Sequence, residues 1–267
     1  MAFFMRRLFI LILTACLGLT SFSQDCSDQV DCPFKDGEQL CYELSYNWGF
    51  IWATAGRVIF SVRDTTIEEA DCWNFRGYGT SLKHWDWFYK VRSAYSSIAN
   101  DQLEPFYFSR IGQEGSNLYN NEYEISDSEA LLQYLDAQGI QKKRSISIPD
   151  CSHDVMTAIY YCRSIPFEEL QPQDTIPLNL LLDGAIHNSY VRYVGKQKWS
   201  HPKTNKTYDC IKFKPRLIAG TVFSEGENMI VYVTDDEHRV PVYVETDLVV
   251  GKAKVFLLPE KSEWVDP

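Results

Sequence analysis

The sequence lacks the short motifs that assign chemistry to many chains. Its five histidines are scattered, with no HxH, no HExxH and no pair at helical spacing, so the sequence predicts no metal site. There is no GxSxG turn and no phosphate-binding loop. Gly77-Tyr78-Gly79 lacks the third glycine of a dinucleotide motif and is more typical of a strand that needs curvature. The sequence therefore predicts no cofactor and no catalytic residue by motif.

Positive charge and long apolar runs are also scarce. The formal net charge is −10, and no basic cluster is denser than Gln141–Arg144. Because nucleic-acid binding needs a basic stripe, we expect no nucleic-acid partner. After the first twenty residues no apolar segment reaches membrane-spanning length, and LVVGKAKVFLL is interrupted by Lys252 and Lys254, whose burial in lipid would be costly. We expect no transmembrane span in the mature protein.

The amino terminus has the pattern of an export signal. Arg6 and Arg7 precede the apolar run Leu8–Thr20, and small residues then predict cleavage after Ser23 or Gln24. Removing residues 1–24 takes away two arginines and no acid, so the net charge goes from −10 to −12. The run LTAC also matches a lipoprotein signal with lipidation at Cys16, although the apolar residues after Cys16 argue against it. Both alternatives predict an exported protein, periplasmic or associated with the outer membrane.

The cysteines of the chain could form disulfides, but they show no redox or zinc motif. Seven remain after the predicted cleavage: Cys26, Cys32, Cys41, Cys72, Cys151, Cys162 and Cys210. Export permits disulfides, and the odd number leaves at least one cysteine unpaired. None is spaced as CxxC, so neither a thioredoxin-like site nor a zinc ribbon is predicted. The pairing cannot be read from the spacing.

Alternation with a period of two dominates the rest of the chain. Leu40, Tyr42, Leu44, Tyr46 and Trp48 share one face of a predicted strand, and similar short strands recur to Leu257 with turn residues between many of them. The pattern predicts a mainly β fold, an antiparallel meander forming a barrel or a strongly curved sheet. We expect an irregular lead-in over residues 25–37 and a single β-rich domain over residues 38–267.

One short helix is predicted around residues 152–163. Asp150 or Ser152 is the expected N-cap. Val155, Ile159 and Cys162 follow at spacings of four and three, so they share one helix face. Such a helix could plug or cover one mouth of a barrel.

Aromatic side chains give the first candidate binding site. They cluster in NWGFIWATAG, HWDWFYKVRSAYSS and PFYF, where a strand over the second segment would be aromatic on both faces. Aromatic residues line apolar pockets and bind sugars, but they also fill β cores. The predicted lining residues are Trp48, Trp52, Trp85, Trp87, Tyr89, Phe106 and Phe108. Charged residues that could point into a lumen and pair there are Asp86, Lys90, Arg92, Arg110 and Glu114.

The stretch VYVTDDEHRVPVYVE, Val231–Glu245, concentrates five charged or titratable residues between two alternating strands. The pattern favours the tip of a β-hairpin, because adjacent aspartates suit a turn and Pro241 removes a ladder donor. A hydrolase using paired carboxylates would have Asp235, Asp236 and Glu114 as its candidates. That reading requires the three groups to converge in one pocket.

Several segments, taken in order, resemble the domain-of-unknown-function 3108 family of exported bacterial proteins, in particular its Bacteroidetes-type members. The carrying segments are GEQLCYELSYNWGFIWATAGRVIF, DWFYKVRSAYSS, PFYFSRIGQEG, DVMTAIYYCR and TDDEHRVPVYVE. The resemblance implies export to the cell envelope and a single β-rich domain. It implies no catalytic residues, and the cysteine content is high for such a domain.

Together these observations favour a non-enzymatic envelope protein that binds an apolar or glycan ligand. A structural or assembly partner at the outer membrane is the main alternative, and a carboxylate-dependent hydrolase is the third. The expected partners are accordingly a lipid, a glycan or an envelope protein. A cavity would favour the first reading, whereas a large exposed apolar patch would favour the second.

Overall fold

The computed structural model describes residues 32–48, 51–67, 69–136, 138–218, 225–249 and 251–258. The predicted signal segment, Cys16 and most of the predicted lead-in lie outside these residues. The strands are β1 (Gln39–Trp48), β2 (Ile51–Ile67), β3 (Ala70–Ser81), β4 (Val91–Ala99), β5 (Pro105–Glu114), β6 (Asn117–Ile125), β7 (Glu129–Leu135), β8 (Gln141–Ser147), β9 (Ser152–His153), β10 (Thr175–Leu182), β11 (Ala185–Ser200), β12 (Thr207–Pro215), β13 (Met229–Thr234), β14 (Pro241–Asp247) and β15 (Lys252–Leu257). The helices are η1 (Lys83–Trp85), α2 (Asp86–Tyr89), α3 (Val155–Ser164) and η2 (Phe167–Glu169).

These strands form one sheet in which nearly every strand pairs with its neighbours in sequence. The order runs β8 to β1, then β15 down to β9, and the β1–β15 pairing joins the two ends of the chain. All pairings are antiparallel except the short parallel pairing of β9 with β10. The predicted antiparallel meander is confirmed. The sheet ends at β8 and β9 without closing, so it is a strongly curved sheet rather than a closed barrel.

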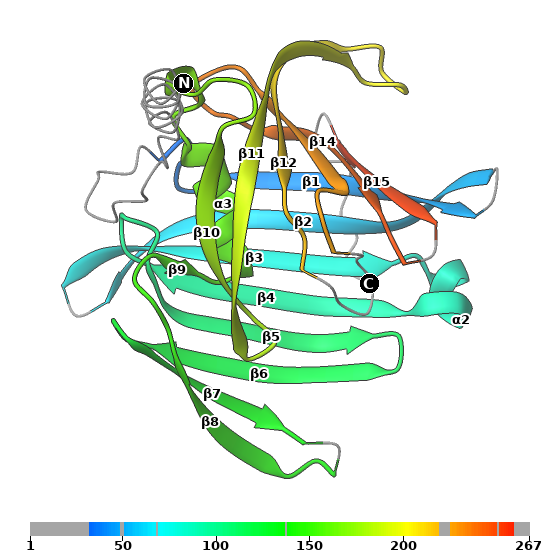
Figure 1. Cartoon of the computed structure of the whole chain (residues 1–267). Helices are drawn as coiled ribbons and strands as arrows, with labels where there is room; N and C mark the ends of the chain where they lie inside the picture. Colours follow the sequence, from blue (N-terminus) through cyan, green and yellow to red (C-terminus); the bar gives the residue numbers. More distant parts are fainter. Residues whose placement is uncertain are drawn as a thin grey trace, which may run out of the picture.

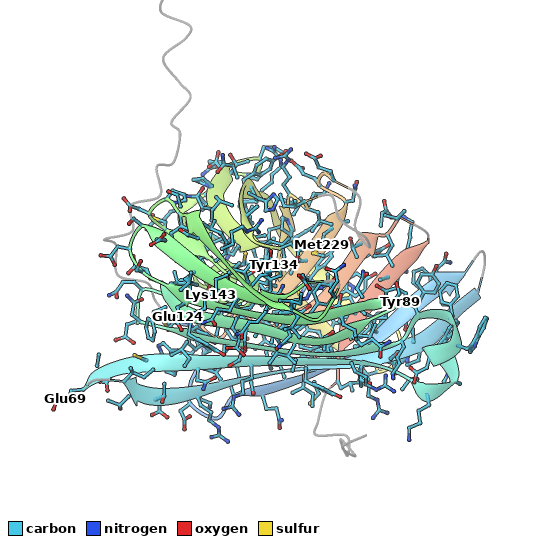
Figure 2. All side chains as sticks on the ribbon, turned by 90° about the horizontal axis from the view of Figure 1, so that it is seen from below. Glu69, Tyr89, Glu124, Tyr134, Lys143 and Met229 are labelled. Atoms are coloured by element: carbon cyan, nitrogen blue, oxygen red, sulfur yellow. The ribbon has the colours of Figure 1, made fainter. Side chains whose placement is uncertain are left out.

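The sheet curves until its second half, β9–β15, lies across its first half, β1–β8 (Figure 1). Seen from below, the first half forms a broad floor and the second half arches over it (Figure 2). The turn between β10 and β11 ties the halves together. Asp183 at this turn accepts a hydrogen bond from Arg110 of β5, and the Gly184 carbonyl accepts one from Arg144 of β8.

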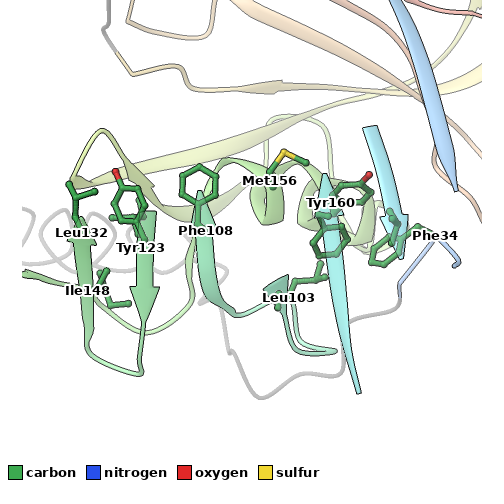
Figure 3. Packing of buried hydrophobic residues seen from close by; sticks show 13 residues of the cluster. Phe34, Leu103, Phe108, Tyr123, Leu132, Ile148, Met156 and Tyr160 are labelled. Atoms are coloured by element: carbon green, nitrogen blue, oxygen red, sulfur yellow. The ribbon is translucent and has the colours of Figure 1, made fainter. Parts of the chain in front are cut away.

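The main hydrophobic core fills the space between the first half and α3. Phe34, Phe75 and Tyr160 pack as an aromatic triad, with the Phe75 and Tyr160 rings stacked at 4.3 Å between centroids. Met156 of α3 and Phe108 of β5 extend the same cluster (Figure 3). A second cluster packs α3's carboxyl end and η2 against β10–β13. The alternating apolar residues therefore find their partners on the concave side of the curved sheet.

The predicted helix exists but begins later than expected. Neither Asp150 nor Ser152 is its N-cap. The cap is Asp154, whose carboxylate accepts from the backbone N–H groups of Met156 and Thr157. The expectation failed because Ser152 and His153 are extended and pair with β10, which delays helical backbone until Val155. The predicted shared face is confirmed as described below.

The aromatic segment after β3 is not the predicted strand. Residues 83–89 form η1 and α2, so Trp85, Trp87 and Tyr89 do not alternate across a sheet. The physical reason is topological. Thr80 of β3 pairs directly with Arg92 of β4, so the chain between them has to reverse direction. The strand that follows, β4, begins at Val91.

Candidate functional site

A cavity of about 650 Å³ lies inside the curved sheet, beside α3. Val155, Ile159 and Cys162, which the helical spacing placed on one face, all line it. Burial raises the pKa of the Cys162 thiol to about 12, so this thiol stays neutral and behaves as an apolar group. Met156, Tyr160 and Arg163 are the most buried side chains of α3, together with Thr157. The helix thus lies between the packed core and the cavity, and the buried Tyr160 and Arg163 also border the cavity.

Both halves of the sheet supply the walls of the cavity. Within one strand every second residue lines the cavity, because successive side chains of a strand point to opposite faces. The apolar lining includes Leu40 and Tyr42 of β1, Val58 and Phe60 of β2, Phe108 of β5, Leu178, Leu180 and Leu182 of β10, Phe213 of β12, Val231 and Val233 of β13, and Val255 of β15. The wall is therefore mainly apolar: aliphatic side chains predominate, and Phe and Tyr rings contact one another on the first half, as Tyr95, Phe108 and Tyr123 do.

Charged side chains enter the lining at Arg163, at Arg216 and in a group around Arg110. The Arg110 guanidinium donates to Glu114 at 2.7 Å and to Asp183 at 2.8 Å, and it lies 3.6 Å above the centre of the Tyr119 ring. Glu114 also accepts from Ser93 Oγ and Tyr95 Oη, each at 2.9 Å. Burial raises the pKa of Tyr95, which keeps that phenol protonated and donating. We call Arg110, Glu114, Asp183 and Tyr119 the polar end of the cavity.

The polar end offers recognition rather than acid–base chemistry. Glu114 accepts three hydrogen bonds, one of them from an arginine, so both of its oxygens already have partners within the protein. Arg110 Nε is buried and has no hydrogen-bond partner in the described part of the chain. An uncompensated buried donor is costly, so a ligand atom or a water that accepted from it would be stabilised. The arrangement can therefore orient a polar group at the cavity wall.

Among the predicted aromatic lining residues, Phe108 lines the cavity and the others are elsewhere where they are described. Trp52 is exposed and lies under the Lys254 ammonium. Trp85, Trp87 and Tyr89 belong to η1 and α2, and Trp85 Nε1 donates to the Thr54 carbonyl. Phe106 is half-buried and is not among the described lining residues. The side chain of Trp48 lies outside what the structure describes.

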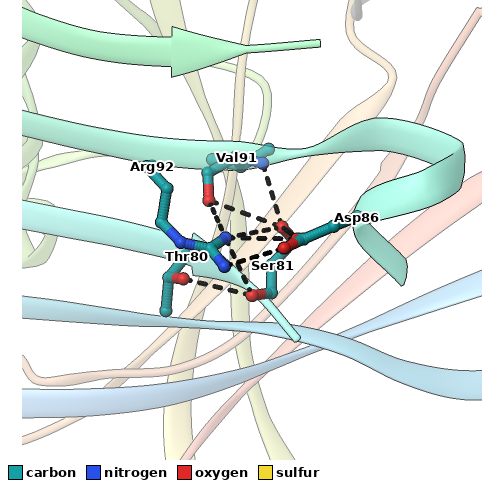
Figure 4. Close-up of polar contacts among 5 residues, drawn as sticks. All are labelled: Thr80, Ser81, Asp86, Val91 and Arg92. Atoms are coloured by element: carbon teal, nitrogen blue, oxygen red, sulfur yellow. Dashed lines mark hydrogen bonds and ion pairs between the residues drawn. The ribbon is translucent and has the colours of Figure 1, made fainter. Parts of the chain in front are cut away.

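The predicted polar residues divide into two separate groups. Arg110 and Glu114 face the cavity, whereas Asp86 and Arg92 pair with each other at the turn between β3 and β4 (Figure 4). Ser81 Oγ donates to Asp86, and this hydrogen bond and the Arg92 charge lower the pKa of the Asp86 carboxyl. Ser81 Oγ also accepts from the Val91 N–H. This second group fixes the corner of the chain and does not line the cavity. Lys90 follows α2 and leads into β4.

The charged cluster at residues 235–239 is the tip of the β13–β14 hairpin, as the sequence pattern predicts. Asp236 accepts from the backbone N–H groups of His238 and Arg239, and β14 begins at Pro241. Asp235 pairs with Lys196 of β11. Neither aspartate is among the described residues that line the cavity, so the structure does not bring Asp235, Asp236 and Glu114 into one pocket. The requirement of the carboxylate hydrolase is not met.

The hairpin tip has a structural partner that the sequence did not reveal. Arg163 of α3 donates to the His238 carbonyl at 2.9 Å, while Arg239 donates to the carbonyl of Ile165 and to Glu168. Arg163 is almost fully buried and pairs through both terminal nitrogens with Glu38. These contacts join α3, the start of β1 and the hairpin. No sequence signal pairs residues so far apart.

Cys151 is disulfide-bonded, and Cys72, Cys162 and Cys210 carry thiols. No described helix combines the length and the apolar character that a membrane crossing requires. Within the described residues, no group of three or more His, Cys, Asp or Glu side chains is arranged to hold a metal ion.

Comparisons with known proteins agree with the fold. A family model described as "Protein of unknown function (DUF3108)" matches residues 41–258. The chain is similar to a crystal structure from Brucella abortus, described as a beta-barrel-like protein of domain of unknown function DUF1849, with a TM-score of 0.52 and 9% identity. The similarity covers 82% of this chain and 94% of that one, and it concerns the fold alone. The comparison with curated proteins gives no match.

Proposed function

We propose that this chain, which belongs to the DUF3108 family, binds a lipid-like molecule in its interior cavity. The ligand would have an elongated apolar part along the aliphatic walls and a polar group at the polar end. The observation that carries the proposal is the cavity itself, about 650 Å³ in volume and lined mainly by apolar side chains. Pockets for small organic ligands have volumes of roughly 300–1,000 Å³ and similar linings.

An empty space of this size and lining would be costly as a mere packing defect. Protein interiors are close-packed, because each void removes contacts from the side chains around it. The cavity of about 650 Å³ is partly open to solvent, so its apolar walls face water instead of packed side chains. A ligand that replaces the missing contacts offsets this cost.

The lining favours an apolar ligand over a glycan. Sugar sites use flat aromatic platforms together with several hydrogen-bonding side chains. Of the tryptophans that the sequence offered for such platforms, Trp52, Trp85 and Trp87 are not part of the described lining. The wall beside α3 is formed by side chains such as Ile159, Leu178 and Val231, which have no hydrogen bonds to offer a hydroxyl group.

A probe-binding experiment tests the proposal. N-phenyl-1-naphthylamine is a neutral apolar dye whose fluorescence rises in an apolar site, so it requires no particular polar group. We expect saturable binding to the wild-type protein. Ile159→Trp should weaken this binding at least tenfold, because the larger side chain fills the space beside α3.

The matched control is Ile140→Trp, because Ile140 is exposed at the turn between β7 and β8. That variant should bind the dye like the wild type. Equal binding by Ile159→Trp and Ile140→Trp, with both proteins folded by circular dichroism, would overturn the cavity as the binding site.

The proposal includes a place of action, the cell envelope, for which the N-terminal pattern is the support. Arg6, Arg7 and the apolar run that follows favour export. The mass of the N-terminal peptide after purification from the producing cell distinguishes ordinary signal cleavage from lipidation. Cleavage after Ser23 or Gln24 gives an unmodified terminus, whereas a lipoprotein would begin at a lipidated Cys16. An uncleaved terminus would contradict both.

A further inference from the structure

The short helical corner between β3 and β4 exposes three consecutive aromatic side chains. Trp87 is 74% exposed, Phe88 45% and Tyr89 37%. We call these three residues the aromatic corner. Figure 1 shows α2 projecting from the end of the sheet, and Figure 2 places Tyr89 at the opposite end from Glu69. The cavity does not use these side chains, so their exposure needs another explanation.

The exposure is held in place by polar contacts. Asp86 accepts from Ser81 and pairs with Arg92 at 2.9 Å, which fixes the start of α2. Trp85 Nε1 donates to the Thr54 carbonyl at 2.9 Å and anchors η1 on β2. Two separate anchors thus hold a segment in which Trp87 is mostly exposed and Phe88 and Tyr89 are partly exposed. A loosely attached loop would not need them.

Positive charge accompanies the aromatic corner. Lys83 and His84 are exposed on η1, and Lys90 follows α2 directly. Asp86 is the one acid within residues 83–90, and its charge is already matched by Arg92. The segment is therefore locally basic in a chain whose net charge is −10. Such a combination of exposed aromatic and lysine side chains is typical of segments that lie at a membrane surface.

We propose that the aromatic corner docks the protein on the surface of an anionic lipid bilayer. Trp and Tyr rings favour the headgroup region, where one side of the ring is apolar and the other is wet. Each lysine beside them strengthens binding to an anionic lipid surface by about fivefold. Lys83 and Lys90 flank the aromatic corner on both sides, as this arrangement requires.

The size and composition of the surface favour a bilayer over a protein partner. The exposed parts of the three rings amount to roughly 300 Å², if each side chain has about 200 Å². A stable protein interface buries about 800 Å² on each partner and is depleted of lysine at its core. A few inserted aromatic side chains with flanking lysines are sufficient for reversible membrane binding.

The aromatic corner also adjoins the polar end of the cavity. A Cβ atom added at Gly115, the residue after Glu114, would lie 2.6 Å from the Tyr89 ring, so the ring packs directly on the β5–β6 turn. Burial and the nearby Glu114 charge raise the pKa of Tyr89. A bilayer at the aromatic corner would therefore lie close to Arg110 and Tyr119. The idea that a ligand passes there rests on the proposed function, but docking itself does not.

Vesicle binding tests the proposal. The protein, processed as its producing cell leaves it, is mixed with vesicles of phosphatidylglycerol and phosphatidylethanolamine or of phosphatidylcholine alone. Tryptophan quenching by brominated acyl chains is the local readout. We expect anionic vesicles to quench the tryptophan fluorescence, and we expect less quenching at high salt. Most of the quenching should be lost in Trp87→Phe. Trp87→Ser with Phe88→Ser should weaken binding at least tenfold, and Lys83→Glu severalfold.

Matched controls separate this surface from general stickiness. Leu135→Ser with Ile140→Ser removes exposed apolar side chains at the β7–β8 turn, and Lys143→Glu reverses an exposed charge on β8. Both should bind vesicles like the wild type. Absence of vesicle binding at low salt, unchanged quenching in Trp87→Phe, or equal loss in the controls would each overturn the proposal.

The same proteins distinguish docking from cavity binding. Trp87→Ser with Phe88→Ser should bind the naphthylamine dye normally when vesicles are absent, whereas Ile159→Trp should bind vesicles normally. Failure of dye binding with intact vesicle binding contradicts the proposed function alone. A wild-type protein that forms an oligomer and does not bind vesicles would favour a protein partner and overturn docking on lipid.

Discussion

The two sides of α3 differ in a way that separates stability from function. On one side, Met156 is fully buried in the core, and the buried Tyr160 ring stacks on Phe75 and meets Phe34 edge-on, although it also borders the cavity. On the other side, Val155 and Ile159 are half-buried and border a cavity of about 650 Å³. One helix thus completes the core and at the same time leaves a space open. Packing contacts explain the first side, and the proposed ligand would fill the space on the second.

The largest expected effect lies at the carboxyl end of the packed side. Arg163→Met removes a buried guanidinium that pairs with Glu38 at 2.6 Å and donates to the His238 carbonyl. It leaves the Glu38 carboxylate without its partner, so we expect a loss of about 3–5 kcal/mol in the free energy of unfolding. Urea unfolding measures it. Lys198→Met breaks an exposed pair with Asp209 and should cost less than about 1 kcal/mol. Equal costs would contradict the assignment of Arg163 as a structural anchor.

The next prediction compares two side chains of similar size on the two sides. Met156→Ala should cost about 2–5 kcal/mol, because it leaves a hole in close-packed surroundings. Ile159→Ala should cost less than about 1 kcal/mol, since Ile159 already borders open space and loses few contacts. If chemical denaturation gives Ile159→Ala the larger cost, the cavity side is packed more tightly than described here.

A third prediction concerns two buried titratable groups at the start of α3. Burial raises the pKa of the Asp154 carboxyl to about 6, despite hydrogen bonds from Ser97 and from backbone N–H groups. Burial lowers the pKa of the His153 imidazole to about 4. The stabilising contribution of neutral Asp154 to the free energy of unfolding is present below about pH 4 and is lost as the pH rises through 6. The stabilising contribution of neutral His153 is present above about pH 6.5 and is lost as the pH falls through 4.

The two groups therefore have opposite effects between about pH 4 and 6, and single substitutions should separate them. Relative to the wild type, Asp154→Asn should gain about 2 kcal/mol in unfolding free energy as the pH rises from 4 to 6. Asn keeps an N-cap acceptor, so helix capping is retained. His153→Gln should lose a similar amount over the same range. Parallel pH profiles for wild type and variants would show that these groups titrate normally.

The smallest expected effect is at the hairpin that docks on the end of α3. Asp236→Ala removes the acceptor of two backbone N–H groups and should cost about 1 kcal/mol, measured by urea unfolding. Asp236→Asn should retain most of the stability. Glu237→Ala, at an exposed neighbour in the same turn, should be within about 0.5 kcal/mol of the wild type. A cost confined to Glu237→Ala would be inconsistent with a turn held by Asp236.

The sequence predicted most of the fold because the fold is local. Nearly every strand pairs with its neighbour in sequence, so alternation and turn residues were sufficient for the meander. The helix face of Val155, Ile159 and Cys162 followed from spacing alone. The failures came where tertiary contacts override local pattern. Ser152 and His153 pair with β10 and move the helix start, and the reversal between Thr80 and Arg92 turns an alternating aromatic segment into a helical corner.

The candidate site was only partly predictable for a similar reason. Arg110, Glu114 and Phe108 were named from composition and alternation, and they do line the cavity. Tryptophans were expected beside them because large aromatic residues favour pockets, but Trp52 and Trp87 are exposed. The Leu178, Leu180 and Leu182 alternation was visible, yet the sequence could not show which strands face each other across a curved sheet. Asp183 reaches Arg110 only because the two halves fold over each other.

The central claim is that the space beside α3 holds an apolar chain of limited length. A displacement series tests it most directly: linear alkanols of increasing length compete with bound N-phenyl-1-naphthylamine. Each added methylene should strengthen binding by about 0.8 kcal/mol, roughly fourfold, until the cavity is full, after which affinity should level off. The plateau should come at a shorter chain in Ile159→Trp than in Ile140→Trp. Affinity that rises without a plateau, or a plateau at the same length in both variants, would contradict the account.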